Sequence, residues 1–169
     1  MTKIHDIKQV PPQKGYYIAG FVDGEGSFFI TARPRKDYAS GWKFSGHFNV
    51  TNADRQVLEI CKKYLGCGKI RETRSDLYTL EIADRRLFEN FLFPFFKRFG
   101  FLSNKKRHEL QIFKKALKQI QLGIKTQKDL ENILALRKHL NKFRNTRITH
   151  TDSVILETFK VKESSETIR

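Results

Sequence analysis

The sequence predicts an α+β domain with one antiparallel sheet, in the order αββαββα, followed by C-terminal helices. Two pairs of segments alternate apolar and polar residues, as strands with one buried face do. A segment with apolar residues at helical spacing precedes each pair, and longer ones follow the second. Strands grouped in hairpins, with the helices apart from them, are typical of an antiparallel sheet covered on one side. The 169 residues, 39% of them hydrophobic, suffice for a buried core.

The N-terminal part predicts a flexible arm over residues 1–14 and a short helix over residues 16–24. At 100° per residue, the helix has one bulky arc, made of Tyr17, Ile18, Phe21 and Val22. The other arc is small: Ala19, Gly20, Asp23 and Gly24. We expect the bulky arc to pack on its own domain. The small arc is flat enough for the same helix of a second copy to approach about a two-fold axis.

Two hairpins are predicted, over residues 27–38 with 43–51 and over residues 68–73 with 77–83. Their inward positions hold Phe28, Ile30, Ala32, Phe44, Phe48, Val50, Tyr78, Leu80 and Ile82. The outward positions carry mostly polar and basic side chains, which donate hydrogen bonds to base edges and phosphates in DNA. A solvated strand face is the alternative. The predicted DNA-binding residues are Phe29, Thr31, Arg33, Arg35, Lys43, Ser45, His47, Asn49, Lys69, Arg71, Thr73 and Thr79, with Phe29 suited to thymine methyl groups.

The remaining segments predict helices with recognisable ends. A helix is predicted over residues 53–66, with Asp54 as its N-terminal cap and Gly66 at its end. An aromatic helix is predicted over residues 84–102, with Asp84 as its cap and a break or kink at Pro94. Helices over residues 103–123, capped by Ser103 or Asn104, and over residues 126–141 follow. The domain then spans residues 15–142. Residues 143–169 form a basic tail within the same unit, with a last short helix over residues 152–159.

The charge of the chain indicates a polyanionic partner. Lys and Arg number 33 against 18 Asp and Glu, a net charge of +15, so nucleic acid is the first candidate and a membrane surface the second. We see no apolar run long enough to span a membrane and no signal peptide, which predicts an intracellular, non-secreted protein. Two cysteines are too few for a disulfide framework or a zinc site, and the pattern of a nucleotide-binding P-loop is absent. No small-molecule cofactor is expected.

Glu25 is the candidate metal ligand. It follows the first helix at or just beyond its C-terminal end, where the helix dipole disfavours a carboxylate unless a cation joins it. Mg²⁺ binds such oxygen-rich sites through one or two carboxylates, waters and substrate phosphates. Asp23 is close enough in sequence to remain a second candidate.

The stretch IAGFVDGEGS resembles the motif of the LAGLIDADG homing endonucleases, whose nine positions fall on Ile18 to Gly26. The resemblance covers about residues 14–142 and implies that family's saddle-shaped sheet. It also implies cleavage of double-stranded DNA at a long pseudo-palindromic target, leaving 3′ overhangs, by an intron-encoded enzyme. Because the motif occurs once, it implies a homodimer with the motif helices at the dimer axis. The metal would be Mg²⁺ or Mn²⁺, with Ca²⁺ supporting binding without cleavage.

By the same resemblance, Glu25 is a metal ligand and the Gly24 carbonyl a second one. Asn52 stands where the family has a polar catalytic residue, often Gln. Lys105 or Lys106 supplies the family's basic residue; both lie in the first turn of a helix, where the dipole disfavours cations, which indicates a phosphate contact. A non-cleaving relative, either an RNA maturase or a DNA-binding regulator, is the alternative function. The implied compartment is a chloroplast, a mitochondrion, or a bacterial or archaeal cytoplasm.

Overall fold

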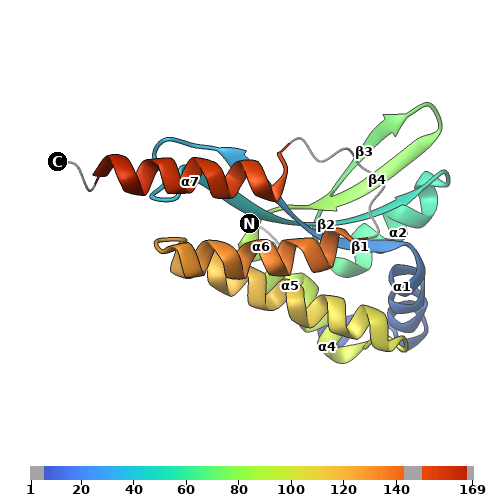
Figure 1. The fold of residues 1–169 in the computed structure, drawn as a ribbon. Coiled ribbons are helices and arrows are strands. Elements are labelled where there is room, and N and C mark those ends of the chain that lie inside the picture. The colour runs from blue at the N-terminus through green and yellow to red at the C-terminus, as the bar shows by residue number, and fades with distance from the viewer. Residues whose placement is uncertain (1–5, 143–149, 167–169) are drawn as a thin grey trace. The chain divides into compact units, whose positions relative to one another are not determined.

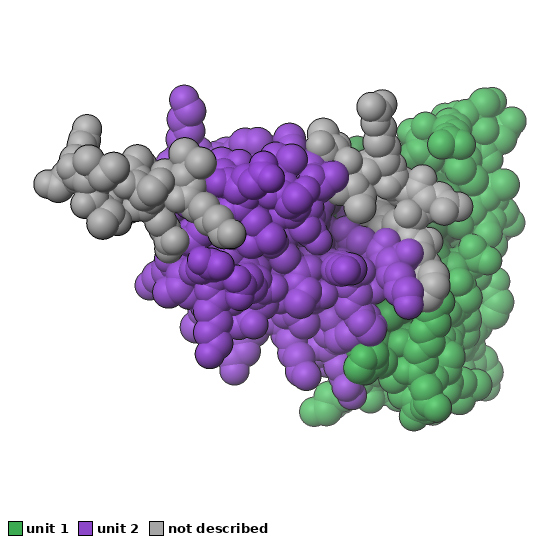
Figure 2. All heavy atoms as spheres, viewed as in Figure 1, with its two compact units in different colours: residues 1–28, 47–110 green, residues 29–46, 111–169 purple. Residues whose placement is uncertain are grey.

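The computed structural model describes residues 6–142 and 150–166, with side chains as far as Phe159. The chain forms two compact units (Figure 2), and Figure 1 labels their helices and strands. Unit 1 comprises residues 1–28 and 47–110, and unit 2 comprises residues 29–46 and 111–169. No helix among the described residues has both the length and the apolar character that a bilayer crossing requires.

The predicted α+β element order is confirmed. A 3-10 turn, η1 (Ile7–Gln9), precedes α1 (Pro12–Glu25), β1 (Gly26–Pro34), β2 (Trp42–Asn52), α2 (Arg55–Leu65), β3 (Lys69–Arg74) and β4 (Leu77–Ile82). Five helical elements follow: α3 (Arg85–Leu87), the π-helical turn η2 (Phe88–Leu92), α4 (Phe93–Arg98), α5 (Asn104–Leu122) and α6 (Gln127–Asn141). The last helix is α7 (Asp152–Glu166), which extends beyond the predicted residues 152–159.

The four strands form one sheet in the order β1-β2-β4-β3. Strand β4 runs antiparallel to both neighbours, with Thr79 opposite Thr51 of β2 and Arg71 of β3. The predicted turn between β3 and β4 is present, with Asp76 in the left-handed conformation that Asp tolerates. The caps of α2 are also as predicted: Asp54 accepts a hydrogen bond from the Gln56 amide, and Gly66 ends the helix.

Aromatic side chains fill the core of unit 1. Phe28 packs on Phe48, with 5.1 Å between ring centroids, and Phe96 packs on Phe101 at 4.4 Å. Three phenylalanines of the aromatic segment, Phe88, Phe95 and Phe96, are buried in this core, whereas Phe91 is half-buried. Of the break or kink predicted at Pro94, the break is absent, and the kink stays a prediction. Pro94 stands in the first turn of α4, where the missing amide hydrogen is tolerated, and helical backbone continues into α4 from η2.

The predicted flexible arm does not extend to residue 14. Helix α1 begins at Pro12, whose fixed φ suits a first helical position, and Val10 is buried. The guanidinium of Arg98 donates a hydrogen bond to the Ile7 carbonyl and so ties the preceding turn to α4. Residues 1–5 lie outside the described part of the chain.

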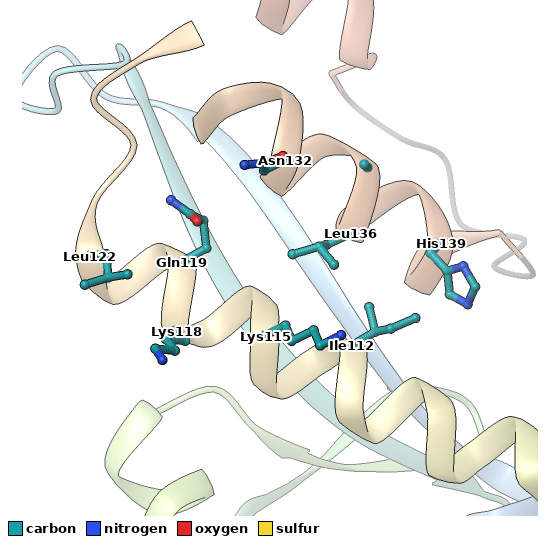
Figure 3. A pocket seen from close by; sticks show the side chains of 9 residues that line it. Ile112, Lys115, Lys118, Gln119, Leu122, Asn132, Leu136 and His139 are labelled. Atoms are coloured by element: carbon teal, nitrogen blue, oxygen red, sulfur yellow. The ribbon is translucent and has the colours of Figure 1, made fainter. Parts of the chain in front are cut away.

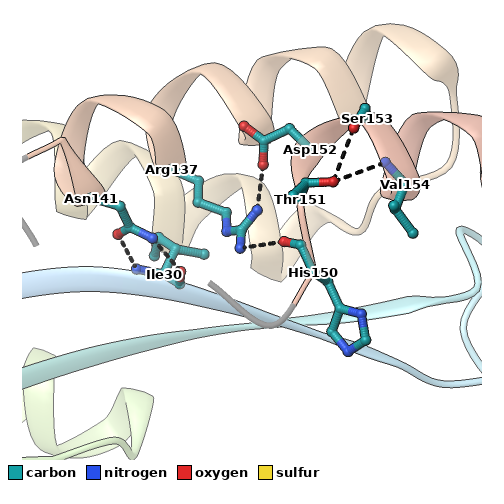
Figure 4. Close-up of polar contacts among 8 residues, drawn as sticks. All are labelled: Ile30, Arg137, Asn141, His150, Thr151, Asp152, Ser153 and Val154. Carbon is teal, nitrogen blue, oxygen red and sulfur yellow. Dashed lines mark hydrogen bonds and ion pairs between the residues drawn. The ribbon is translucent and has the colours of Figure 1, made fainter. Parts of the chain in front are cut away.

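In unit 2, polar contacts hold α6 to β1 and to the start of α7 (Figure 4). The Asn141 amide pairs with both backbone groups of Ile30, accepting from its nitrogen at 3.4 Å and donating to its oxygen at 3.2 Å. The buried guanidinium of Arg137 donates to the Asp152 carboxylate and, at 3.1 Å, to the His150 carbonyl. The part of the predicted tail that is described is therefore packed helix; residues 143–149 lie outside the described residues.

Candidate functional site

The candidate metal ligand lies at the last position of α1. Glu25 is exposed there, and β1 begins at the next residue, Gly26. The C-terminal end of a helix carries partial negative charge, so the position favours a bound cation over a bare carboxylate. Gly24, the predicted carbonyl ligand, is also exposed.

Asp23 joins the end of α1 to the start of α5. One carboxylate oxygen accepts a hydrogen bond from the Ser103 amide at 2.9 Å, and the other accepts one from the Ser103 hydroxyl. Partial burial acts to raise the pKa of Asp23, but the hydrogen bonds from Ser103, its backbone and Leu102, with the charge of Lys106, together lower it. Asp23 therefore stays ionised and engaged within its own chain. Its predicted place in a dimer interface stays a prediction.

The two candidate lysines have different environments. Lys105 is exposed, whereas only 7% of Lys106 is accessible. The Lys106 ammonium donates to the Gly26 carbonyl at 2.6 Å and lies 3.0 Å from the Glu109 carboxylate. Its amide donates to the Ser103 hydroxyl, which is the cap that the sequence predicts for α5. Lys106 is thus the lysine bonded to the backbone that follows Glu25.

The exposed arc of α1 differs from the predicted one. Ala19, predicted at a dimer interface, is only 2% exposed within its own chain, because the inner face of α1 consists of Gly15, Ile18, Ala19 and Val22. Tyr17, predicted to be core, is 53% exposed, and its ring stacks parallel to the half-buried Phe21. The open surface is a helical stripe, which we call the α1 stripe: Tyr17, Gly20, Phe21 and Gly24. A Cβ atom on either glycine would meet none of the described residues outside its own helix within 4 Å.

Asn52 ends β2 and is half-buried. Its side-chain oxygen accepts a hydrogen bond from the Asp54 amide at 2.8 Å, which shapes the turn into α2. The structure thus gives Asn52 a local structural role, and its catalytic role stays a prediction.

The strand face of unit 1 keeps most of its predicted donors. Lys69, Arg71 and Thr73 are exposed on β3, and His47 and Asn49 are half-buried on β2. Thr79 is a correction: it is only 7% exposed, because β4 lies between two strands and the Thr79 hydroxyl is hydrogen-bonded to Thr51 at 2.8 Å.

Glu81 was missed on the same face. Its carboxylate pairs with Arg71 and lies 3.4 Å from Nδ1 of His47. The alternation along β4 could have identified it, since Glu81 is out of phase with the apolar Leu80 and Ile82.

In unit 2 the strand face differs at one predicted position. Phe29 is only 6% exposed, and its neighbours Phe28 and Ile30 are buried too. Because successive strand residues point to opposite faces, β1 is covered on both faces there, and Phe29 is not available to thymine. The other predicted residues keep some exposure: Arg33 and Arg35 are exposed, and Thr31, Lys43 and Ser45 are half-buried.

A hollow of about 570 Å³ lies between α5 and α6 in unit 2 (Figure 3). It contains no carboxylate and so adds nothing to a cation site. The lining residues are Ile112, Lys115, Lys118, Gln119, Leu122, Asn132, Ala135, Leu136 and His139.

Comparison with known proteins identifies relatives of this chain. Residues 18–117 match the sequence profile of the family described as LAGLIDADG endonuclease. The probable intron-encoded endonuclease 2 of Neurospora crassa is 30% identical over 131 residues, which cover 74% of this chain and 28% of that protein. The homing endonuclease I-ApeII of Aeropyrum pernix is 29% identical over 70 residues, covering 41% of this chain and 42% of that protein. The chain thus spans less than half the length of either relative.

Solved structures share the fold. The archaeal intron-encoded homing endonuclease I-Vdi141I, complexed with DNA, aligns with a TM-score of 0.77 at 24% identity, covering 90% of this chain and 98% of that one. The I-SmaMI LAGLIDADG homing endonuclease, bound to cleaved DNA, aligns with a TM-score of 0.68 at 28% identity, covering 79% of this chain and 45% of that one. I-SmaMI also has a structure with an uncleaved DNA target in the presence of calcium ions. The predicted fold class is confirmed.

Proposed function

The chain belongs to the LAGLIDADG endonuclease family, and from that premise we propose that it is a homodimeric, divalent-metal-dependent endonuclease of double-stranded DNA. The observation that carries this proposal is the placement of Glu25. Its carboxylate is exposed at the end of α1, immediately beyond the α1 stripe. Two copies that meet through their α1 stripes would bring two such carboxylates together, one for each DNA strand.

The α1 stripe supports the dimer. Its members follow the i, i+3, i+4, i+7 spacing of a helix–helix contact. Gly20 and Gly24 are both exposed and leave room for a second backbone, while Tyr17 and Phe21 offer aromatic surface on either side. A two-fold axis would pair this surface with itself.

The residues of one chain fit a divalent cation only in part. Within the described residues, no three His, Cys, Asp or Glu side chains cluster in a way that could hold a metal. Mg²⁺ and Mn²⁺ do not require such a cluster, because one or two carboxylates, waters and substrate phosphates complete their coordination. We therefore assign the metal to Glu25, the Gly24 carbonyl, the Glu25 of a second copy and the scissile phosphates. Bound there, it would supply a nucleophilic water and stabilise the departing 3′ oxygen.

The residues around Glu25 have supporting roles in this proposal. Lys106 fixes the Gly26 carbonyl and therefore the backbone that carries Glu25. Lys105, which is exposed in the first turn of α5, would neutralise phosphate charge. Basic and polar side chains on the strands of each unit would bind the phosphates and base edges of a long pseudo-palindromic target. Cleavage across its centre would leave 3′ overhangs.

The test combines selection with one substitution. The protein is incubated with Mg²⁺ and a library of duplexes, the cut ends are sequenced, and Glu25→Gln is then assayed on the selected target. We expect cleavage to fall by about a hundredfold or more, since even the residues that orient metal ligands contribute 10- to 100-fold. DNA affinity should persist.

Glu89→Gln is the matched control. Glu89 is exposed on η2 and pairs with Arg85 at 3.8 Å, so Glu89→Gln makes the same chemical change on an element other than α1. A chelator should stop cleavage by the unsubstituted protein. Cleavage by Glu25→Gln at the rate of the Glu89→Gln control would refute the assignment of Glu25.

A further inference from the structure

A carboxylate stands within the basic strand face of unit 1. Glu81 lies on β4, and its partners in register are Asn49 on β2 and Lys69 on β3. If this face binds phosphates, as the proposed function requires, a carboxylate here weakens the attraction. The side chain therefore needs a role that outweighs this cost.

The contacts of Glu81 restrain Arg71, a basic side chain of the same strand face. One carboxylate oxygen accepts the Arg71 guanidinium, and the other lies 3.4 Å from Nδ1 of His47. Only 24% of the Glu81 side chain is exposed, against 62% of Arg71. Arg71 is thus held by its partner and still open to a ligand. Both residues and Lys69 line a recess of about 800 Å³, so an entering group could reach the pair.

We propose that Glu81 is a specificity-determining residue of the DNA-binding face, an inference that rests on the proposed function. Glu81 keeps Arg71 from binding any passing phosphate, and the pair recognises a C·G base pair. Arginine donates two hydrogen bonds to O6 and N7 of guanine, and glutamate accepts one from the N4 amino group of cytosine. Where a base presents only hydrogen-bond acceptors to Glu81, the negative carboxylate faces atoms of partial negative charge. The repulsion disfavours binding to that DNA sequence.

Binding to short duplexes of random sequence tests the restraint on Arg71. Loss of a partly exposed ion pair releases Arg71, so Glu81→Gln should tighten binding by about two- to fivefold. The salt dependence of log K should steepen by up to about 0.9, the effect of one added phosphate contact. In an Arg71→Gln background the same substitution should have a much smaller effect, because there is no guanidinium to release.

Two control variants make the outcome specific. Glu72→Gln removes the same charge from β3, but Glu72 lies opposite Tyr78, on the other side of the strand from Arg71. Lys69→Gln should weaken random-duplex binding more than Arg71→Gln does, since of these two basic residues it is Arg71 that Glu81 restrains in an ion pair. This comparison also serves if Glu81→Gln proves unfolded in a melting experiment. Two results would overturn the proposal: an equal gain in affinity for random duplexes from Glu81→Gln and Glu72→Gln, or an equal loss of that affinity from Lys69→Gln and Arg71→Gln.

Selection of preferred targets tests base recognition. Glu81→Gln should relax the preference for C·G at one position of each half-site and leave the other positions unchanged. An unchanged preference throughout would overturn the assignment. If the unsubstituted protein binds no duplex at any salt concentration, the proposed function fails. If it binds DNA and the Glu81 variants behave like their controls, this inference alone fails.

Discussion

Replacing Asp23 by Asn tests whether the junction of α1 and α5 depends on charge. Asp23 accepts two hydrogen bonds from Ser103, at the N-terminal end of α5, where the helix dipole favours an anion. Hydrogen bonds to charged groups are worth roughly 1.5–3 kcal/mol. Because Asn retains one acceptor oxygen, we expect a loss of about 1–2 kcal/mol. For a chain of this length that lowers Tm by roughly 2–8 °C.

The pH dependence separates charge from shape. The pKa of Asp23 is lower in the folded protein than its ordinary value of 3.8. The carboxylate therefore contributes stability above its unfolded pKa, and this contribution is lost as the pH falls through the folded pKa. The gap in Tm between the unsubstituted protein and Asp23→Asn should be widest near pH 7 and should narrow below about pH 4.

Removing any acid increases charge repulsion in a chain of net charge +15, so part of the effect of Asp23→Asn is not specific to its site. Asp76→Asn is the control that measures this general effect. Asp76 is exposed in a turn whose left-handed backbone suits Asn equally well. Thermal unfolding followed by circular dichroism from neutral to acid pH measures both gaps. Two results would refute a charge-dependent junction of α1 and α5: a loss of Tm in Asp23→Asn equal to that of the control at pH 7, or a loss that stays constant down to acid pH.

Two further predictions concern α1 and the cysteines. Gly20→Leu should leave the fold intact, because the new side chain enters open space, but it should prevent two α1 stripes from meeting. In sedimentation we expect the variant to be a monomer and the unsubstituted protein a dimer. A variant that still forms a normal dimer would contradict the contact through the α1 stripe. Burial raises the pKa of Cys61 to about 11 and that of Cys67 to about 12, so both thiols stay neutral at pH 8. Native protein should then resist iodoacetamide until it is unfolded in urea, and rapid labelling of folded protein would show that the thiols are accessible.

Local sequence patterns were sufficient to predict secondary structure and buried side chains wherever a segment has a single apolar face. Helix α2 buries Leu58, Cys61 and Leu65 on a single stripe and keeps its charged residues away from that stripe, so its phase and both ends could be predicted. The strands were predictable for the same reason, because alternation fixes which side chains point inward. Phe29 broke the pattern, because alternation alone does not reveal that a strand is covered on both faces.

Helix α1 shows where this approach fails. Both of its arcs are apolar or small, so periodicity does not determine which arc packs against the rest of the chain. Of the bulkier arc that we expected to be buried, Ile18 and Val22 are buried. The helix is nevertheless turned so that Gly15 lies against Phe99, where an added Cβ would come within 2.4 Å of the ring. Tyr17 and Phe21 are consequently turned outward. The burial of Lys106 was equally inaccessible, because its partner Gly26 is 80 residues away in sequence.

The four residues from Asp23 to Gly26 connect the fold to the proposed chemistry. Asp23 and Gly26 are both bonded to the first turn of α5, through Ser103 and Lys106, so the backbone of Glu25 is held on both sides while its carboxylate stays exposed. Holding a ligand in place beforehand reduces the entropy lost when a cation and DNA bind. Lys106 is engaged by Gly26 and Glu109, so its ammonium is already committed within the chain. In the proposed mechanism, the charge that balances Glu25 and the scissile phosphates would then come from the bound cation and from the exposed Lys105, not from Lys106.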